Sequence, residues 1–80
     1  MYFHVLGFGI AKDIFNGSSV SVHMEKVKTV GELKTKLEHT YPKLKQLASY
    51  MIAVNNNYST DLELIKESDE IAVIPPVTGG

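Results

Sequence analysis

The chain has 80 residues, the size of one small domain, and a formal net charge of −1. All eight basic residues are lysine, and this lack of arginine together with the neutral balance argues against nucleic-acid binding. No cysteine is present to form a disulfide or a thiolate metal site. No apolar run reaches the ~20 residues of a membrane helix, so we expect a cytoplasmic domain without a membrane partner.

The first part of the chain carries two strand patterns and one helical turn. Residues 2–8 are aromatic and β-branched, which predicts a strand with Phe3 and Phe8 on opposite faces. Residues 10–15 fit one short helical turn, which ends at the turn dipeptide Asn16-Gly17. Residues 19–25 alternate apolar with polar side chains, as a half-buried strand does.

The clearest helix is predicted to begin at Thr29. Thr29 as N-cap and Glu32 three residues later form a capping-box pattern. The helix should end near Tyr41, because Pro42 disfavours helical geometry in the residue before it. Its apolar stripe is formed by Val30, Leu33 and Leu37.

Shorter patterns fill the second half. They predict a helical segment around residues 44–48, a strand at 51–54, a turn at 55–57, a short strand from Tyr58, and a final strand at 70–74. Residues 61–66 fit either a loop or a helical turn. The final strand is almost continuously apolar, which is typical of a central position. The order predicts an α+β fold of the β-grasp (ubiquitin-like) type, with a mixed sheet of four to five strands and one main helix packed across it.

The last six residues, 75–80, form an expected extended tail on a single domain that spans residues 1–80. Pro75 and Pro76 cannot donate to a sheet ladder, so the chain should leave the domain there. Six extended residues reach up to about 20 Å. Gly79 and Gly80 have no side chains and can enter a narrow channel, and the reactive group that they deliver is the α-carboxylate of Gly80.

At this point several segments resemble the small subunit of molybdopterin synthase, a family of ubiquitin-like sulfur carriers. The specific segment is residues 69–80, which read DEIAVIPPVTGG. Weaker matches are Phe8 with Lys12-Asp13, Thr29-Val30-x-x-Leu33, and Ala53-Val54-Asn55. The family commonly has Arg-Glu where this chain has Lys12-Asp13.

The resemblance implies that an ATP-dependent activating enzyme adenylates Gly80 and that a sulfurtransferase converts it to a thiocarboxylate. The tail, with Pro75, Pro76, Val77 and Thr78, would then enter the large subunit of molybdopterin synthase, where sulfur passes to cyclic pyranopterin monophosphate. It also implies an apolar patch of Phe8, Tyr58 and Ile74 that docks both partners. The chain itself would bind no cofactor or metal, and it would not be an enzyme on its own.

Other interpretations stay open at this point. Phe8 and Ile74 fit a hydrophobic core as well as a docking patch. The tail also suits a sulfur carrier for thiamine thiazole synthesis, or a ubiquitin-like modifier that forms isopeptide bonds through Gly80. The three histidines, His4, His23 and His39, have no short ligand spacing and are expected to be ordinary surface or half-buried side chains. Asp69-Glu70 is expected to end a turn rather than to form a carboxylate pair.

Overall fold

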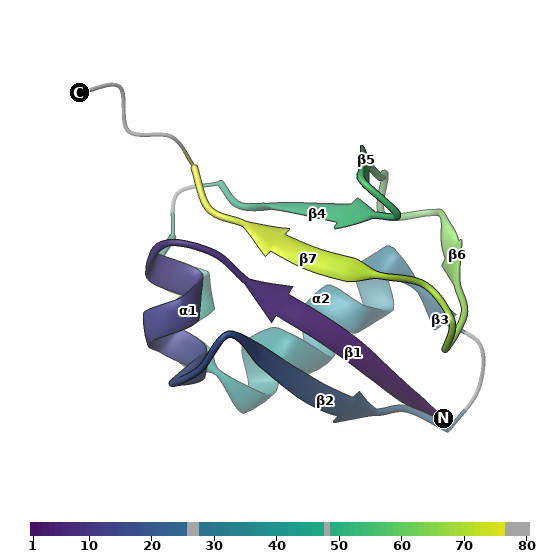
Figure 1. Cartoon of the computed structure of the whole chain (residues 1–80), viewed down its shortest axis with the longest axis horizontal. Coiled ribbons are helices and arrows are strands. Elements are labelled where there is room, and N and C mark those ends of the chain that lie inside the picture. Colours follow the sequence, from purple (N-terminus) through teal and green to yellow (C-terminus); the bar gives the residue numbers. More distant parts are fainter. Residues whose placement is uncertain (26–27, 48, 77–80) are drawn as a thin grey trace.

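The computed structural model describes residues 1–25, 28–47 and 49–76 and shows one sheet with a helix across it (Figure 1). The elements are β1 (Tyr2–Gly7), α1 (Ile10–Phe15), β2 (Ser19–His23), β3 (Lys28–Thr29), α2 (Val30–Thr40), the 3₁₀ helix η1 (Pro42–Gln46), β4 (Met51–Val54), β5 (Asn57–Tyr58), β6 (Leu64–Ile65) and β7 (Ile71–Ile74).

The main sheet has five strands in the order β2-β1-β7-β4-β5. β1 and β7 pair in parallel, and the other neighbours pair antiparallel, so the sheet is mixed. α2 crosses one face of this sheet, and the other face is left open (Figure 1). The central position predicted for the last strand and the β-grasp architecture are both confirmed.

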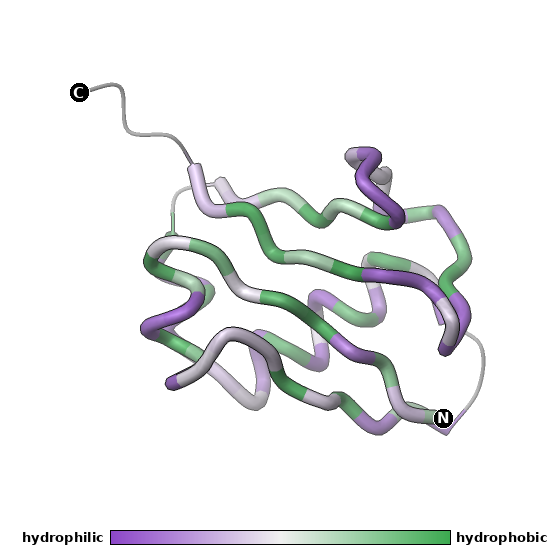
Figure 2. Tube along the Cα trace, viewed as in Figure 1, coloured by the Kyte–Doolittle hydropathy of each residue, from purple (hydrophilic) through white to green (hydrophobic). Residues whose placement is uncertain are grey.

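The core lies between the sheet and the helices. Along β1 the side chains of Phe3 and Val5 are fully buried, whereas His4 is exposed and Leu6 is half-buried. The apolar stripe of α2 closes the core from the other side, and its members are Val30, Leu33 and Leu37. In Figure 2 apolar segments accordingly alternate with polar ones along β1 and β2.

The predicted capping box of α2 is present. The Thr29 hydroxyl accepts a hydrogen bond from the Glu32 backbone N–H at 3.2 Å, and the Thr29 N–H donates to the Glu32 carboxylate at 3.0 Å. The backbone N–H of Thr29 is the largest cause of the lowered pKa of Glu32. Two orphan donors at the helix start are therefore satisfied locally.

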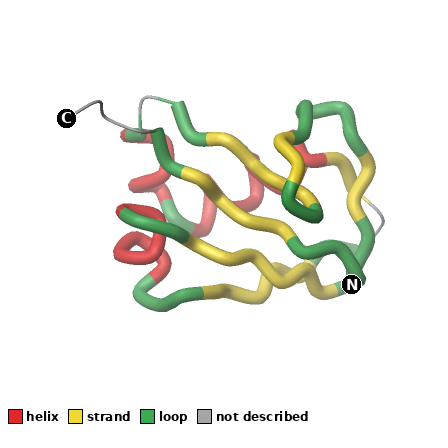
Figure 3. Tube along the Cα trace, turned by 45° about the horizontal axis from the view of Figure 1, so that its top comes forward, coloured by secondary structure: helices red, strands yellow, loops and turns green. Residues whose placement is uncertain are grey.

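Of the two alternatives predicted for residues 61–66, the loop is right for residues 61–63 and 66, whereas residues 64–65 form the short strand β6, which was not predicted. β6 pairs antiparallel with β3, immediately before α2. The loop in front of β6 then accepts the next helical donors: Val30 N–H bonds to Glu63 O at 2.8 Å, and Gly31 N–H to Asp61 O at 2.9 Å. These two bonds satisfy donors of the first helical turn, and the loop that accepts them leads into β6, which is drawn as a short yellow strand in Figure 3.

Several predicted boundaries differ by a few residues. The final strand expected at 70–74 begins at Ile71, and the short strand expected from Tyr58 begins at Asn57. The strands expected at 2–8 and 19–25 end at Gly7 and His23. The helical segment expected around 44–48 is the 3₁₀ helix η1, which begins at Pro42; Ala48 is outside the described residues. Within the described ranges no helix has both the length and the apolar character to cross a membrane.

Candidate functional site

The three side chains predicted to form a patch lie together on the open face of the sheet. Phe8 follows β1, Tyr58 belongs to β5 and Ile74 ends β7. They line one hollow of about 310 Å³, whose walls are Leu6, Phe8, Ala53, Asn56, Tyr58, Glu70, Ala72 and Ile74. Segments far apart in the sequence, from Leu6 to Ile74, thus contribute to one surface, and we call these eight residues the sheet-face patch.

Strand register explains why the patch is hollow. Leu6 of β1 is opposite Ala72 of β7, Ala72 is opposite Ala53 of β4, and Ala53 is opposite Tyr58 of β5. These four residues form a row across four strands, and side chains opposite one another share a face of the sheet. The two alanines in the middle of the row leave space between the larger side chains at its ends.

The exposed fractions of Phe8 and Tyr58 show that both aromatic side chains of the patch belong to the surface and not to the core. The Phe8 side chain is 50% exposed and Tyr58 is 64% exposed, so neither is a core residue. Ile74 is half-buried at the end of β7. The polar residues Asn56 and Glu70 stand at the rim of the hollow. An apolar surface with a polar rim is the composition of a protein docking site.

The sequence interpretation missed Met51 as a neighbour of the patch. Met51 is directly opposite Ile74 in the β4–β7 pair, and its side chain is 48% exposed. The signal was available, because Ile52 is buried and alternation places Met51 and Ala53 on the opposite face. Met51 extends the apolar surface to the base of the tail.

The tail base leaves the sheet directly beside this patch. Pro75 and Pro76 are half-buried and belong to no strand. Pro75 lies against Gly9, since a Cβ placed on Gly9 would approach Pro75 Cγ to 3.3 Å. Gly9 also has a φ of +56°, a conformation that favours glycine. The predicted site residues Val77, Thr78, Gly79 and Gly80 lie outside the described residues.

A protein-family model identifies the family of this chain. The model of the ThiS family matches residues 5–80. The chain belongs to the ThiS family.

The sequences of two curated relatives align with nearly the whole of this chain. The molybdopterin synthase sulfur carrier subunit of Dictyostelium discoideum is 35% identical over 82 residues, which cover 98% of this chain and 95% of that protein. The protein of the same name from Arabidopsis thaliana is 30% identical over 77 residues, covering 95% of this chain and 80% of that protein.

Solved structures agree with the ThiS-family fold. A putative molybdopterin converting factor subunit 1 from Pyrococcus furiosus has a TM-score of 0.86 at 22% identity, covering 96% of this chain and 99% of its own. The small archaeal modifier protein 1 of Methanosarcina acetivorans has a TM-score of 0.78 at 26% sequence identity, and the match covers 99% of this chain and 96% of that protein. A chain in the complex of subunits 1 and 2 of molybdopterin-converting factor from Helicobacter pylori has a TM-score of 0.68 at 27% sequence identity, and the match covers both chains fully.

At the opposite end of β7 the ThiS-family chain has a hydrogen-bonded turn. The Asp69 carboxylate accepts from the Lys66 backbone N–H at 2.7 Å and from the Asn55 side-chain amide at 3.0 Å. Asn55 accepts in turn from the Glu70 N–H at 2.9 Å. The Lys66 N–H is the largest cause of the lowered pKa of Asp69. Asp69-Glu70 therefore ends a turn, as predicted, and anchors the start of the central strand.

The histidines of the ThiS-family chain do not gather. His23 packs against Tyr2 with ring centroids 4.8 Å apart and ring planes tilted by 53°, and His39 lies on α2. His4 is opposite Ser21 in the β1–β2 pair. Among the residues that the structure describes, no three histidine or carboxylate side chains are close enough to hold a metal ion together.

Proposed function

We propose that this ThiS-family chain is the sulfur carrier of molybdenum cofactor biosynthesis and acts as the small subunit of a molybdopterin synthase. The observation that carries the proposal is its similarity, over 95–98% of its length, to sulfur carrier subunits of molybdopterin synthase. The sheet-face patch beside the tail base supports it, because a carrier needs a docking surface close to the atom that it delivers.

The proposed chemistry takes place at the α-carboxylate of Gly80. A carboxylate is a poor electrophile, so ATP first converts it to an acyl-adenylate with release of pyrophosphate by the activating enzyme. A sulfur nucleophile supplied by a sulfurtransferase then displaces AMP. One carboxylate oxygen is thereby replaced by sulfur, and the resulting thiocarboxylate is a nucleophile on a narrow arm.

The sheet-face patch would bring the arm to its partners. Ile74 lies in the patch, and Pro75 and Pro76 follow it directly, so a protein that covers the patch also receives the tail. The fixed φ of two prolines reduces the conformational freedom that the tail base loses on insertion. The Helicobacter pylori structure contains a second, different subunit beside the chain that resembles this one, which supports a large-subunit partner.

In the large subunit, the thiocarboxylate sulfur would attack a carbon of cyclic pyranopterin monophosphate and form a C–S bond, while the C–O bond of that carbon breaks and its oxygen substituent leaves. Water then hydrolyses the thioester that links the pterin to Gly80, which leaves sulfur on the pterin and restores the carboxylate. A dithiolene contains two sulfur atoms, so two charged carriers are consumed per pterin. This chain contributes the sulfur and the arm, and the large subunit contributes the substrate pocket.

The test is a reconstitution with purified activating enzyme, sulfur donor, ATP and large subunit. Intact-mass analysis should show one oxygen of the carrier replaced by sulfur, and addition of the large subunit with the pterin precursor should restore the original mass as molybdopterin forms. A variant without Gly80 should fail at the first step. An unchanged carrier mass in the presence of partners that charge another carrier would refute the proposal.

A modifier function is the second candidate, and one likeness favours it. The chain is 26% identical to the small archaeal modifier protein 1 of Methanosarcina acetivorans. Isopeptide formation would use the same adenylate but would transfer Gly80 to a lysine amine of a target protein. The products of the two functions distinguish them. A modifier forms covalent adducts with target proteins, which appear as species of higher mass in a lysate supplied with ATP. A thiamine-type carrier gives a thiocarboxylate that does not react with the pterin precursor.

A further inference from the structure

The parallel pairing of β1 with β7 brings the end of one strand beside the base of the tail. In the last pair, Gly7 is opposite Val73. Continued by two residues, this register places Gly9 beside Pro75. The contact between these two residues agrees with it, because a Cβ placed on Gly9 would come within 3.3 Å of Pro75 Cγ. Phe8, the residue before Gly9, belongs to the sheet-face patch, so a docking side chain and the tail base are neighbours.

Gly9 occupies a position in a tight turn that requires a positive φ. The Ala11 N–H donates to the Phe8 carbonyl at 3.0 Å and closes this four-residue turn. Gly9 is its second residue, with φ of +56° and ψ of −129°, which is the geometry of a type II′ turn. The turn leads into α1, whose Ala11 and Phe15 are buried. The core therefore holds the backbone of the turn in place through α1.

The tail base is stiff where it meets the turn. β7 is paired with β4 up to Ile74, so the strand is fixed as far as that residue. The rings of Pro75 and Pro76 fix their own φ, and each proline holds the residue before it in extended geometry. The backbone direction of three successive residues is thus narrowly limited. Residues 76–80 span up to about 16 Å when extended, so a small change of direction at Pro75 is enlarged at Gly80.

We propose that Gly9 is a positioning residue, which sets the direction of the tail by letting the ring of Pro75 lie directly on the turn. A larger residue would bring its Cβ to 3.3 Å from Pro75 Cγ, closer than the roughly 3.5–4.0 Å of ordinary carbon contacts, and would push the tail base away from the turn. The inference rests on the proposed function, because the direction of the tail matters when a docked partner receives Gly80. Phe8 then serves docking, and Gly9 serves the aim of the tail.

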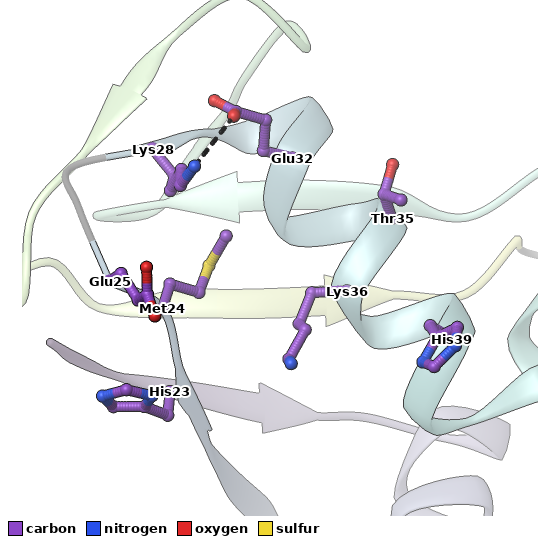
Figure 4. Close-up of a pocket in the computed structure, with 8 residues that line it drawn as sticks. All are labelled: His23, Met24, Glu25, Lys28, Glu32, Thr35, Lys36 and His39. Atoms are coloured by element: carbon purple, nitrogen blue, oxygen red, sulfur yellow. Dashed lines mark hydrogen bonds and ion pairs between the residues drawn. The ribbon is translucent and has the colours of Figure 1, made fainter.

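The groove between α2 and the end of β2 lies away from the tail base (Figure 4). His23, which lines it, pairs with Tyr2 at the start of β1, whereas the tail leaves beside the end of β1. The two lysines of this groove are matched by two glutamates, of which Glu25 is exposed. The substitution Glu25→Ala therefore serves as a remote control.

The test compares Gly9→Ala with Gly17→Ala, the same substitution in the turn after α1. A Cβ on Gly17 would be 3.9 Å from Ser19 O, an ordinary contact. Each carrier is prepared as its thiocarboxylate by cleavage of an intein fusion with sulfide, which bypasses the activating enzyme, and is mixed with the large subunit and the pterin precursor. The rate of sulfur transfer is measured at saturating carrier, and the Kd for the large subunit is measured separately.

Gly9→Ala should transfer sulfur about tenfold more slowly, since a misplacement of about 1 Å can cost roughly 100-fold and the tail base shifts by less than that. Its Kd should change by less than about threefold, because Phe8 still docks. Gly17→Ala and Glu25→Ala should match the wild type in both measurements. Urea unfolding and ¹⁵N spectra show whether each variant is folded.

A second substitution separates positioning from strain in the turn. Pro75→Ala removes Cγ, the atom that the added Cβ would meet. In the Pro75→Ala background, Gly9→Ala should therefore slow transfer by less than about twofold, whereas strain in the turn would slow it equally in both backgrounds. Transfer by Gly9→Ala at the wild-type rate, or an equal loss in both backgrounds, would overturn the inference and leave the proposed function intact.

Two measurements on the wild type complete the test. A wild-type thiocarboxylate that does not convert the pterin precursor would refute the proposed function, and this inference with it. Nuclear Overhauser effects between the Gly9 Hα and the Pro75 ring protons report the contact without any substitution, and they decide the question if Gly9→Ala does not fold. These signals should be present, and their absence would overturn the role of Gly9.

Discussion

The sharpest test of the sheet-face patch is Phe8→Ala. Phe8 is 50% exposed in the hollow, so half of its surface is available to a docking partner. Ile10 is two residues away and also 50% exposed, but it lines a different groove, between α1 and η1. The two substitutions remove apolar side chains of equal fractional exposure, and only one of them lies on the proposed docking face.

The expected magnitude follows from buried area. An aromatic side chain buries roughly 200 Å² when fully covered, so docking can cover about 100 Å² more of Phe8. At about 25 cal/mol per Å², this amounts to about 2.5 kcal/mol, or roughly 60-fold in Kd as an upper limit. Part of that area remains covered in the variant because alanine keeps Cβ. We therefore expect a loss of about tenfold or more for Phe8→Ala and little change for Ile10→Ala.

Isothermal titration of each variant into the purified large subunit measures the effect, and urea unfolding shows that both variants are folded. A Phe8→Ala protein that binds the large subunit with wild-type affinity would refute docking through the sheet-face patch. A larger loss for Ile10→Ala would move the docking surface to the groove between α1 and η1.

Three further predictions concern the fold that carries the patch. Thr29→Ala removes the N-cap side chain of α2 and should lower the free energy of unfolding, measured in urea, by about 1 kcal/mol. Thr29→Ser keeps the capping hydroxyl and should retain most of the wild-type stability. Leu37→Ala empties a fully buried position and should cost about 2–5 kcal/mol by the same measurement; a smaller loss would mean that the core closes around the cavity. The pKa of Asp69 is lowered by the Lys66 N–H, so its carboxylate stabilises the fold above its ordinary pKa of about 4, and this contribution is lost as the pH falls through the folded-state value. Asp69→Asn should therefore flatten the acid side of the stability–pH curve, and an unchanged curve would contradict the role of this turn.

Local patterns accounted for the parts of the fold whose partners are close in sequence. Thr29 and Glu32 satisfy each other within one helical turn, so the capping box was readable directly. The alternation along residues 2–8 placed Phe3 and Phe8 on opposite faces, and the structure buries Phe3 and leaves Phe8 exposed. The continuous apolar run of β7 indicated a central strand, and β7 does lie between β1 and β4; its outward-facing Ala72 and Ile74 are apolar because they line the hollow of the sheet-face patch.

Elements that depend on distant partners were not predictable in this way. β3 and β6 have two residues each, which is too short for any periodicity, and they exist because each pairs with the other. The hollow of the patch likewise needs register across four strands, which places Ala53 and Ala72 side by side. Sequence resemblance supplied Phe8, Tyr58 and Ile74 as patch members, and only the tertiary structure showed that they meet.

The middle position of β7 has a mechanical consequence if, as we propose, a partner protein receives the tail. β7 is held on one side by the parallel pairing with β1 and on the other by the antiparallel pairing with β4. Tension applied at Pro75 runs along the strand axis, so both ladders resist it in shear and their bonds carry the load together. The end of the chain can therefore be pulled without the domain unravelling from that end.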